Sequence, residues 1–313
     1  MRVLVSTANM DRREWLEWRR RGIGSSDAPA IAGLVPGRTP LLVWAEKVGE
    51  VAPSVEPPSE EALWGQLLED IIAREVERRT GFRVRRRRAI IQHDTYNFML
   101  ANLDRLIHDP QFPRAVPLEI KTTSAHRRDE WDDDGVPERV LVQVQHQIAT
   151  TGAPAAYVAA LIGGQRLVIR TVPRDDELIR DLIELEREFW RLVETKTPPP
   201  WDGSDVASEL LRKRYPRATE GAEIVLPPDA IALIQRYEDA QRRAKEAEAE
   251  AEAAKQALQA MLGDAERGIA GDRVVIWKNV TRTSLDSKAL KAAHPAIYAE
   301  FARESTYRRF EIK

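Results

Sequence analysis

The first part of the chain alternates between segments with helical spacing of apolar residues and segments with strand spacing. Residues 60–80 place apolar side chains every three or four positions, which predicts an amphipathic helix that ends at Gly81. Residues 11–33 are expected to form two helices around the loop Gly22-Ile23-Gly24, the second capped by Ser25 or Ser26. The remaining elements expected here are strands over 82–91, 97–104 and 116–122, helices over 139–151 and 175–195, and a hairpin of 156–162 with 166–172.

The pattern changes at the run Thr197-Pro198-Pro199-Pro200, which interrupts regular structure. The polar segment that follows, 201–225, is expected to be a linker. A long helix over 227–262 then contains mainly Ala, Glu, Gln, Lys and Arg, and 269–280 resembles a strand pair. We therefore expect one domain over 1–200, and a long charged helix with a small C-terminal α/β appendage over 226–313.

Strands that alternate with helices along residues 1–200 predict an α/β fold. The expected architecture is a central mixed sheet of about five strands, flanked by helices on both sides. The C-terminal helical appendage would be separate from this core.

Composition excludes some kinds of chemistry. The 313 residues include no cysteine, which rules out disulfides, thiolate metal sites and cysteine nucleophiles. The formal net charge is only −2, because arginine clusters in the first half are balanced by an acidic stretch around Glu246 to Glu252. The N-terminal residues lack a signal-peptide pattern and no apolar run is long enough to cross a bilayer, so a cytoplasmic protein without membrane association is expected.

The motif that carries most chemical information is Leu118-Glu119-Ile120-Lys121, in the third predicted strand. Because side chains alternate along a strand, the carboxylate and the ammonium emerge on one face and the two apolar residues on the other. Asp104 ends the preceding strand and can meet the same edge of the sheet. Two carboxylates suit Mg²⁺ or Mn²⁺, which lowers the pKa of a bound water, while a lysine can stabilise developing charge. The pattern indicates phosphodiester hydrolysis, although Glu119-x-Lys121 in isolation is also the pattern of a surface ion pair.

A third acid lies on the predicted amphipathic helix. Glu69 shares a helix face with Ile72 and Val76, whereas Asp70 points towards solvent. A carboxylate on a partly apolar face needs a partner, because an unpaired buried charge is costly. Either a metal ion or an arginine would serve, and the spacing leaves both open.

Five segments, taken together and in this order, resemble the YqaJ-type viral recombinase family, relatives of the phage lambda exonuclease within the PD-(D/E)XK nuclease superfamily. They are WLEWRRRGIGSSDA (15–28), LWGQLLE (63–69), NLDR (102–105), LEIKTTSA (118–125) and QVQHQIATTGAPAAYVAALIGG (143–164). The second, fourth and fifth are the most specific in combination, and the resemblance implies a PD-(D/E)XK nuclease core.

The resemblance implies a role for each matching residue near the metal. Asp104 and Glu119 would be the principal metal ligands, joined by the main-chain carbonyl of Ile120. The same resemblance makes Glu69 the helix acid near the metal, Lys121 the catalytic lysine and Gln143 a glutamine that lines the site. Asp94 would be a further acidic neighbour.

The resemblance also implies a pocket for a 5′-terminal phosphate, held by Arg19 and Ser26. A guanidinium beside a helix N-terminus suits an anion. Relatives have Ser-Pro-Asp-Gly where this chain has Asn102-Leu103-Asp104-Arg105. Asn102 therefore replaces a serine that could bind phosphate, and the glycine turn after the metal acid is absent. The departure concerns 5′-end recognition more than hydrolysis.

By resemblance, the chain is expected to be a metal-dependent deoxyribonuclease that degrades double-stranded DNA from a free end, 5′ to 3′. It would leave 3′ single strands for phage-type recombination, in the cytoplasm of a bacterium that hosts a phage or prophage. A homo-oligomeric ring and a single-strand annealing protein are the expected partners.

Two alternatives remain open. An endonuclease on the same core would not need a free end, because hydrolysis motifs do not encode end-dependence. A non-catalytic DNA-binding recombination adaptor would use basic patches alone. The acids argue against the adaptor, since they would repel DNA unless a cation intervened.

Overall fold

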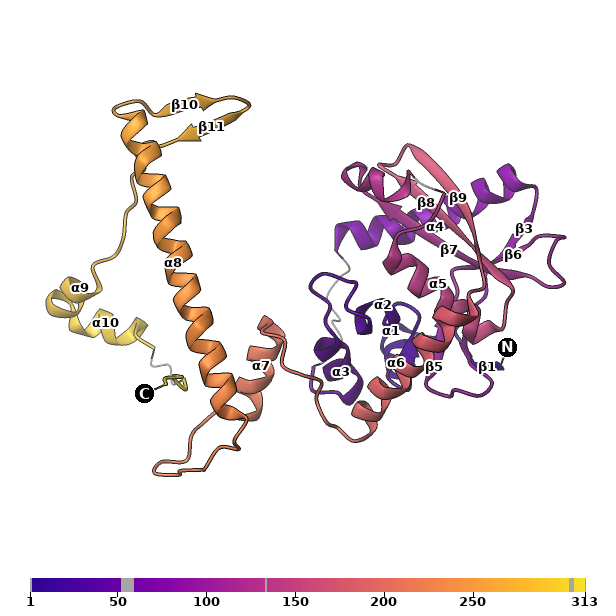
Figure 1. The fold of residues 1–313 in the computed structure, drawn as a ribbon, viewed down its shortest axis with the longest axis horizontal. Helices are drawn as coiled ribbons and strands as arrows, with labels where there is room; N and C mark the ends of the chain where they lie inside the picture. Colours follow the sequence, from indigo (N-terminus) through magenta and orange to yellow (C-terminus); the bar gives the residue numbers. More distant parts are fainter. Residues whose placement is uncertain (1, 52–58, 133, 304–306, 313) are drawn as a thin grey trace. The chain divides into compact units, whose positions relative to one another are not determined.

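The computed structural model describes residues 2–51, 59–132, 134–303 and 307–312 (Figure 1). The chain forms two compact units, Met1–Arg214 and Tyr215–Lys313. Of the helices in the described part, none combines the length and the hydropathy that crossing a membrane would require.

The first unit contains a central five-stranded sheet in the order β3-β6-β7-β8-β9. Its strands are β3 (Arg83–Arg85), β6 (Arg105–His108), β7 (Val116–Thr123), β8 (Ala155–Ile162) and β9 (Arg166–Pro173). β7 and β8 run parallel and the other pairs antiparallel, so the sheet is mixed, as expected. β6 pairs with β7 only as far as Leu118, and the rest of β7 extends beyond it.

Helices cover both faces of this sheet. The helices of the first unit are α1 (Arg12–Arg19), α2 (Ala28–Ile31), α3 (Pro40–Val48), α4 (Glu60–Thr80), α5 (Glu138–Thr151), α6 (Asp176–Glu194) and α7 (Asp205–Arg214), with a short 3₁₀ helix, η1 (Ala125–Trp131). On one face, α4 packs Ile72 and Val76 into a cluster with Leu118 and Ile120 of β7. On the other face, α5 and α6 cover the alternate residues of β8. The predicted helix over 60–80 is confirmed, with Gly81 left-handed at its end.

A second sheet positions the N-terminal part of the site. It contains β1 (Arg2–Ser6), β4 (Ala89–Gln92), β5 (Met99–Asn102) and β2 (Ile23–Gly24), in that order. β2 pairs in parallel with β5, which brings the α1–α2 connection beside the strand that precedes Asp104. A Cβ atom on Gly22 would lie 2.5 Å from the carbonyl oxygen of Phe98, so this approach requires glycine. The single strand predicted over 82–91 is thus two strands, β3 and β4, in different sheets.

The first unit extends beyond the proline run. α7 buries Ala207 and Leu210 in a cluster that includes Trp44 of α3, and Arg214 forms an ion pair with Glu50. The segment expected to be a linker, 201–225, therefore contains a helix that belongs to the first unit. Its polar sequence concealed this helix, because only a few of its side chains are buried.

The second unit contains the long helix that the sequence predicted, α8 (Ala230–Leu262), drawn in orange in Figure 1. The other elements of this unit are β10 (Arg267–Ala270), β11 (Arg273–Ile276), α9 (Ser287–Ala293) and α10 (Pro295–Phe301). β10 and β11 form an antiparallel hairpin, and Phe310 packs edge-on against Tyr237 at a ring separation of 5.6 Å. No residue of this unit that the structure describes is buried.

Candidate active site

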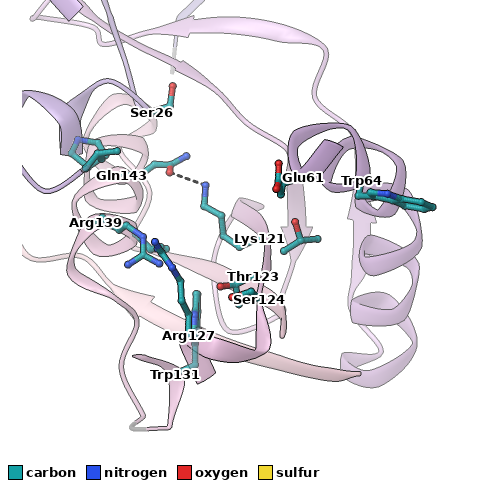
Figure 2. Close-up of a pocket in the computed structure, with 14 residues that line it drawn as sticks. Ser26, Glu61, Trp64, Lys121, Thr123, Ser124, Arg127, Trp131, Arg139 and Gln143 are labelled. Atoms are coloured by element: carbon teal, nitrogen blue, oxygen red, sulfur yellow. Dashed lines mark hydrogen bonds between the residues drawn. The ribbon is translucent and has the colours of Figure 1, made fainter. Parts of the chain in front are cut away.

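Glu119 and Lys121 lie on the face of β7 opposite to Leu118 and Ile120, as strand alternation predicted. Glu119 is buried, and its Oε1 lies 2.7 Å from Nζ of Lys121. Gln143 of α5 joins them, because its Nε2 donates to Oε1 of Glu119 at 2.7 Å while its Oε1 accepts from Lys121 at 2.9 Å. Figure 2 shows the lysine reaching from β7 towards this glutamine. Lys121 is thereby held in one position by two acceptors.

Two glutamines one helical turn apart fix both oxygens of Glu119. Besides Gln143, Gln147 donates from Nε2 to Oε2 of Glu119 at 2.6 Å. Gln145 instead donates to the carbonyl oxygen of Pro173 at 2.8 Å, away from the site. The resemblance assigned Gln143 to the site, but Gln147 was not assigned. The four-residue spacing from Gln143 was the available signal.

Asp104 lies between β5 and β6, where β7 is no longer paired with β6. Its Oδ2 accepts a hydrogen bond from the main-chain N–H of Ile120 at 2.9 Å. Burial and the neighbouring Glu119 raise the pKa of Asp104 well above its usual value, and Lys121 offsets this only in part. Burial alone would lower the pKa of Lys121, but Glu119 and Asp104 raise it. When both carboxylates are ionised, they share one ammonium, and the group then carries excess negative charge.

The donor atoms around Asp104 fit a hard divalent cation. The carboxylates of Asp104 and Glu119 supply oxygen donors, which Mg²⁺ and Mn²⁺ prefer. The carbonyl of Ile120 is a third, since the N–H and C=O of one strand residue point to the same edge, and this N–H faces Asp104. Among the described residues, no group of three or more Asp, Glu or His side chains is arranged to hold a metal. The set that fits is therefore two acids with one carbonyl.

Glu69 is held by an arginine. Arg105, the first residue of β6, is buried, and its guanidinium donates to the carboxylates of both Glu69 and Asp70. Arg86 lies 3.6 Å from Glu69 and 3.2 Å from Asp70. Glu69 is close enough to Asp104 to contribute to its raised pKa. Of the two partners that the sequence left open for Glu69, the structure contains the arginine.

The expected phosphate-binding residues line one cavity together with the acids. This cavity has a volume of about 180 Å³, and its polar lining includes Arg19, Ser25, Ser26, Asn102, Asp104, Glu119 and Gln143. Nη2 of Arg19 donates to Oγ of Ser26 at 2.8 Å. Residues from α1, the β2–α2 connection, β5, β7 and α5 thus meet around the same space. Asp94 lies in the exposed turn between β4 and β5. It lines neither this cavity nor the larger cavity of about 600 Å³ that adjoins it.

A buried aspartate, Asp27, holds Arg19 in place beside this cavity. Asp27 lies 2.7 Å from Nζ of Lys47 and 3.0 Å from each of Arg19 and Arg38. Burial alone would raise the pKa of Asp27, but these three cations hold it well below its usual range. The predicted capping by Ser25 or Ser26 is wrong, since Asp27 takes the N-cap position of α2.

Sequence reasoning missed Asp27, Lys47 and Arg38. Lys47 and Arg38 lie in and just before α3, and no local pattern links them to the aspartate. The available signal was Asp27 itself, an acid directly after a pair of serines in an otherwise apolar segment.

A larger cavity of about 600 Å³ adjoins the first and shares Ser26 and Gln143 with it. Lys121 lines it, and Figure 2 shows Arg127 and Arg139 on the side opposite to Trp64. The side chains that surround Lys121 therefore open onto a space with basic and aromatic walls.

His146 anchors α5 beneath the site. Its Nδ1 lies 2.7 Å from Oε1 of Glu186 in α6, and its Nε2 lies 2.9 Å from the carbonyl oxygen of Leu100 in β5. Both ring nitrogens face oxygen atoms, an arrangement that favours the protonated ring. Burial would lower the pKa of His146, but Glu186 outweighs it and raises this pKa. The pair fixes α5, and with it Gln143 and Gln147, against β5.

Comparison with known proteins gives the family. A YqaJ-like viral recombinase domain matches residues 14–154, a range that contains Glu69, Asp104 and Glu119. The protein YqaJ of Bacillus subtilis (strain 168) is 41% identical over 314 residues, covering 99% of this chain and 97% of that protein. The crystal structure of an alkaline exonuclease (LHK-Exo) from Laribacter hongkongensis superposes with a TM-score of 0.50 at 20% identity, covering 64% of this chain and 97% of that one. The superposition confirms the predicted nuclease-core fold, and this chain belongs to the YqaJ-like viral recombinase family.

Proposed function

We propose that this protein is a metal-dependent DNA exonuclease that degrades duplex DNA from the 5′ end. The observation that carries the proposal is the pair of half-buried Asp104 and buried Glu119, which share the charge of Lys121 and line the same cavity as Arg19. Buried carboxylates without matching positive charge need a cation, and phosphodiester hydrolysis by a divalent ion uses this arrangement.

Asp104, Glu119 and the carbonyl of Ile120 would hold Mg²⁺ or Mn²⁺. When bound, such an ion polarises the phosphate and lowers the pKa of a bound water. Lys121 is oriented by Glu119 and Gln143, so its ammonium is placed to align an attacking water and to stabilise charge on the phosphate oxygens. Gln143 and Gln147 keep the carboxylate of Glu119 in one orientation, so its oxygen atoms would stay in place to bind the metal between turnovers.

The position of Arg19 supports end-dependence. Arg19 lines the cavity that also contains the acids, and its Nη2 donates to Ser26 at 2.8 Å and to Asp27 at 3.0 Å, which fixes the guanidinium at the cavity wall. A guanidinium in this place suits a terminal phosphate, which carries more negative charge than an internal phosphodiester. The cavity volume of about 180 Å³ is small, so a chain end fits it better than a continuous strand does.

The finer parts of the proposal rest on family membership. They are 5′-to-3′ direction, 3′ single strands as product, a homo-oligomeric ring on the DNA, a single-strand annealing protein as partner, and action in the cytoplasm of a bacterial host of a phage or prophage. Sedimentation of the full chain with and without linear duplex DNA tests the ring, since a monomer in both conditions would contradict it.

The proposal is tested with linear duplex DNA that carries either a 5′-phosphate or a 5′-hydroxyl, in the presence of Mg²⁺. We expect mononucleotide release to be faster with the 5′-phosphate and to disappear with EDTA or in Lys121→Ala. Arg19→Ala should remove the preference for the 5′-phosphate. Arg21→Ala is the matched control, since Arg21 lies over the ring of Trp18 as Arg19 lies over that of Trp15, but Arg21 does not line the cavity.

Retention of the 5′-phosphate preference in Arg19→Ala would remove the proposed role of the pocket. Equal rates on both ends in the wild type would contradict the 5′-phosphate pocket, whereas equal cleavage of linear and circular DNA would argue for an endonuclease. DNA binding without cleavage under either metal would leave the adaptor as the function.

A further inference from the structure

Arg105 is aimed at α4 by the geometry of its strand. It lies two residues before Ile107 in β6, so both side chains lie on the same face of the sheet. Ile107 packs in the cluster that contains Ile72 and Val76 of α4. The side chain of Arg105 is 4% exposed and binds Glu69 and Asp70 on adjacent positions of that helix. Strand register, and not a surface rotamer, therefore places this guanidinium between the two acids.

The two pairs of acids differ in how their charge is balanced. Glu69 and Asp70 face two guanidinium groups, those of Arg105 and Arg86. Within the described part of the chain, Glu119 forms an ion pair with Lys121, and Asp104 accepts a hydrogen bond from the main-chain N–H of Ile120. Since an arginine stays protonated throughout the accessible pH range, the charge at Glu69 and Asp70 is balanced permanently. A divalent cation gains most by binding where negative charge is not compensated.

Arg105 also connects the two regions. Besides its contacts to α4, its Nη1 donates to the main-chain carbonyl oxygen of Asp104. The Arg105 side chain thus connects Asp104, whose carboxylate is a proposed metal ligand, to the helix α4 that carries Glu69. A glycine in place of Arg105 would provide neither the positive charge nor this hydrogen-bonded connection.

We propose that Arg105 takes the place of a cation between Glu69 and Asp70, so that this chain binds a single divalent metal ion through Asp104, Glu119 and the carbonyl of Ile120. Glu69 is then not a metal ligand. Arg105 is a positioning residue that holds Asp104 through its main chain. This inference rests on the proposed metal-dependent function and specifies its metal site.

The test is a titration of the full chain with Mn²⁺, in which electron paramagnetic resonance measures the free ion. We expect one bound Mn²⁺ per chain in the wild type and none in Glu119→Gln. Glu69→Gln should bind one Mn²⁺ with a Kd within about twofold of the wild type, because loss of a true ligand or its support costs about tenfold or more. Arg105→Gly should gain a second, weaker Mn²⁺, and the double variant Glu69→Gln/Arg105→Gly should lose it again.

Two Mn²⁺ ions in the wild type, or a tenfold weaker Kd in Glu69→Gln, would overturn the inference. Arg105 is buried, so Arg105→Gly could fail to fold, and circular dichroism checks this. Glu69→Gln then decides alone, since Glu69 is partly exposed and its substitution leaves Arg105 paired with Asp70. A wild type that binds no Mn²⁺ would overturn both proposals, whereas one bound Mn²⁺ without DNA cleavage would overturn only the exonuclease.

Discussion

Two pairs of carboxylates lie close together in the first unit and are held in opposite ways. Glu69 and Asp70, on α4, are partly exposed, and two arginines balance their charge. Asp104, between β5 and β6, is half-buried, Glu119, within β7, is buried, and the two share the charge of Lys121. On the proposed metal site, the surrounding cations, more than the acids themselves, would decide which pair is available to a metal. The predictions below test this contrast, from the largest expected effect to the smallest.

Glu119→Gln should cause the largest loss of activity. The substitution removes the negative charge of a proposed metal ligand and of the carboxylate that orients Lys121. We therefore expect the rate of mononucleotide release from linear duplex DNA to fall by about 10³-fold or more. Asp70→Asn is the control from the other pair and should stay within a few-fold of the wild type. Similar losses in both variants would erase the contrast between the pairs.

A third acid, Glu186, shows the consequence of complete burial. Its partner is His146, and neither side chain is exposed. His146→Ala should lower the free energy of unfolding by about 3–5 kcal/mol, because it leaves a buried carboxylate unpaired. The double variant His146→Leu/Glu186→Leu should recover much of that loss. Urea denaturation measures both, and a single variant as stable as the wild type would show that the pair does not anchor α5.

The stabilisation by Mn²⁺ should grow as the pH rises. The pKa of Asp104 is raised above its usual 3.8 by burial and by Glu119, so without metal its favourable contribution is complete below 3.8 and is lost as the pH rises through the folded-state pKa. Protons compete with Mn²⁺ for this carboxylate at low pH. We expect saturating Mn²⁺ to raise Tm by about 5 °C at alkaline pH and much less at acidic pH. A Tm increase that is independent of pH would show that Asp104 does not bind the ion.

Asp70→Asn should have the smallest effect on stability. The Asp70 side chain is 63% exposed, and its partner Arg105 keeps Glu69. We expect the free energy of unfolding to fall by about 1 kcal/mol or less, as is usual for an exposed ion pair. Urea denaturation of Asp70→Asn and of Glu69→Gln measures how much each acid contributes to the free energy of unfolding. A loss of several kcal/mol in Asp70→Asn would mean that Arg105 depends mainly on the exposed partner.

Local sequence pattern predicted the elements that carry the acids. Alternation along β7 placed Glu119 and Lys121 opposite to Leu118 and Ile120, and helical spacing placed Glu69 on the partly buried side of α4. Both follow from periods that a single segment contains. The hairpin of β8 and β9 across Gly163-Gly164 was predictable for the same reason.

The parts that the sequence did not predict depend on contacts between distant segments. The parallel pairing of β2 with β5 joins Ile23 to Met99, and no local period signals it. Asp27 forms ion pairs with Arg19 of α1 and with Arg38 and Lys47 in and before α3, and these segments come together only in the folded chain. The partner of Glu69 was undetermined because helix spacing does not reveal which side chain of another strand faces it.

Digestion of linear and closed circular duplex DNA of the same sequence tests the proposed exonuclease most directly. Wild type and Glu119→Gln are compared with Mg²⁺ and with EDTA. We predict that the wild type releases mononucleotides only from the linear DNA and only with Mg²⁺, while Glu119→Gln releases almost none. Cleavage of the circle at the same rate, or undiminished cleavage in EDTA or by Glu119→Gln, would contradict a metal-dependent exonuclease centred on Asp104 and Glu119.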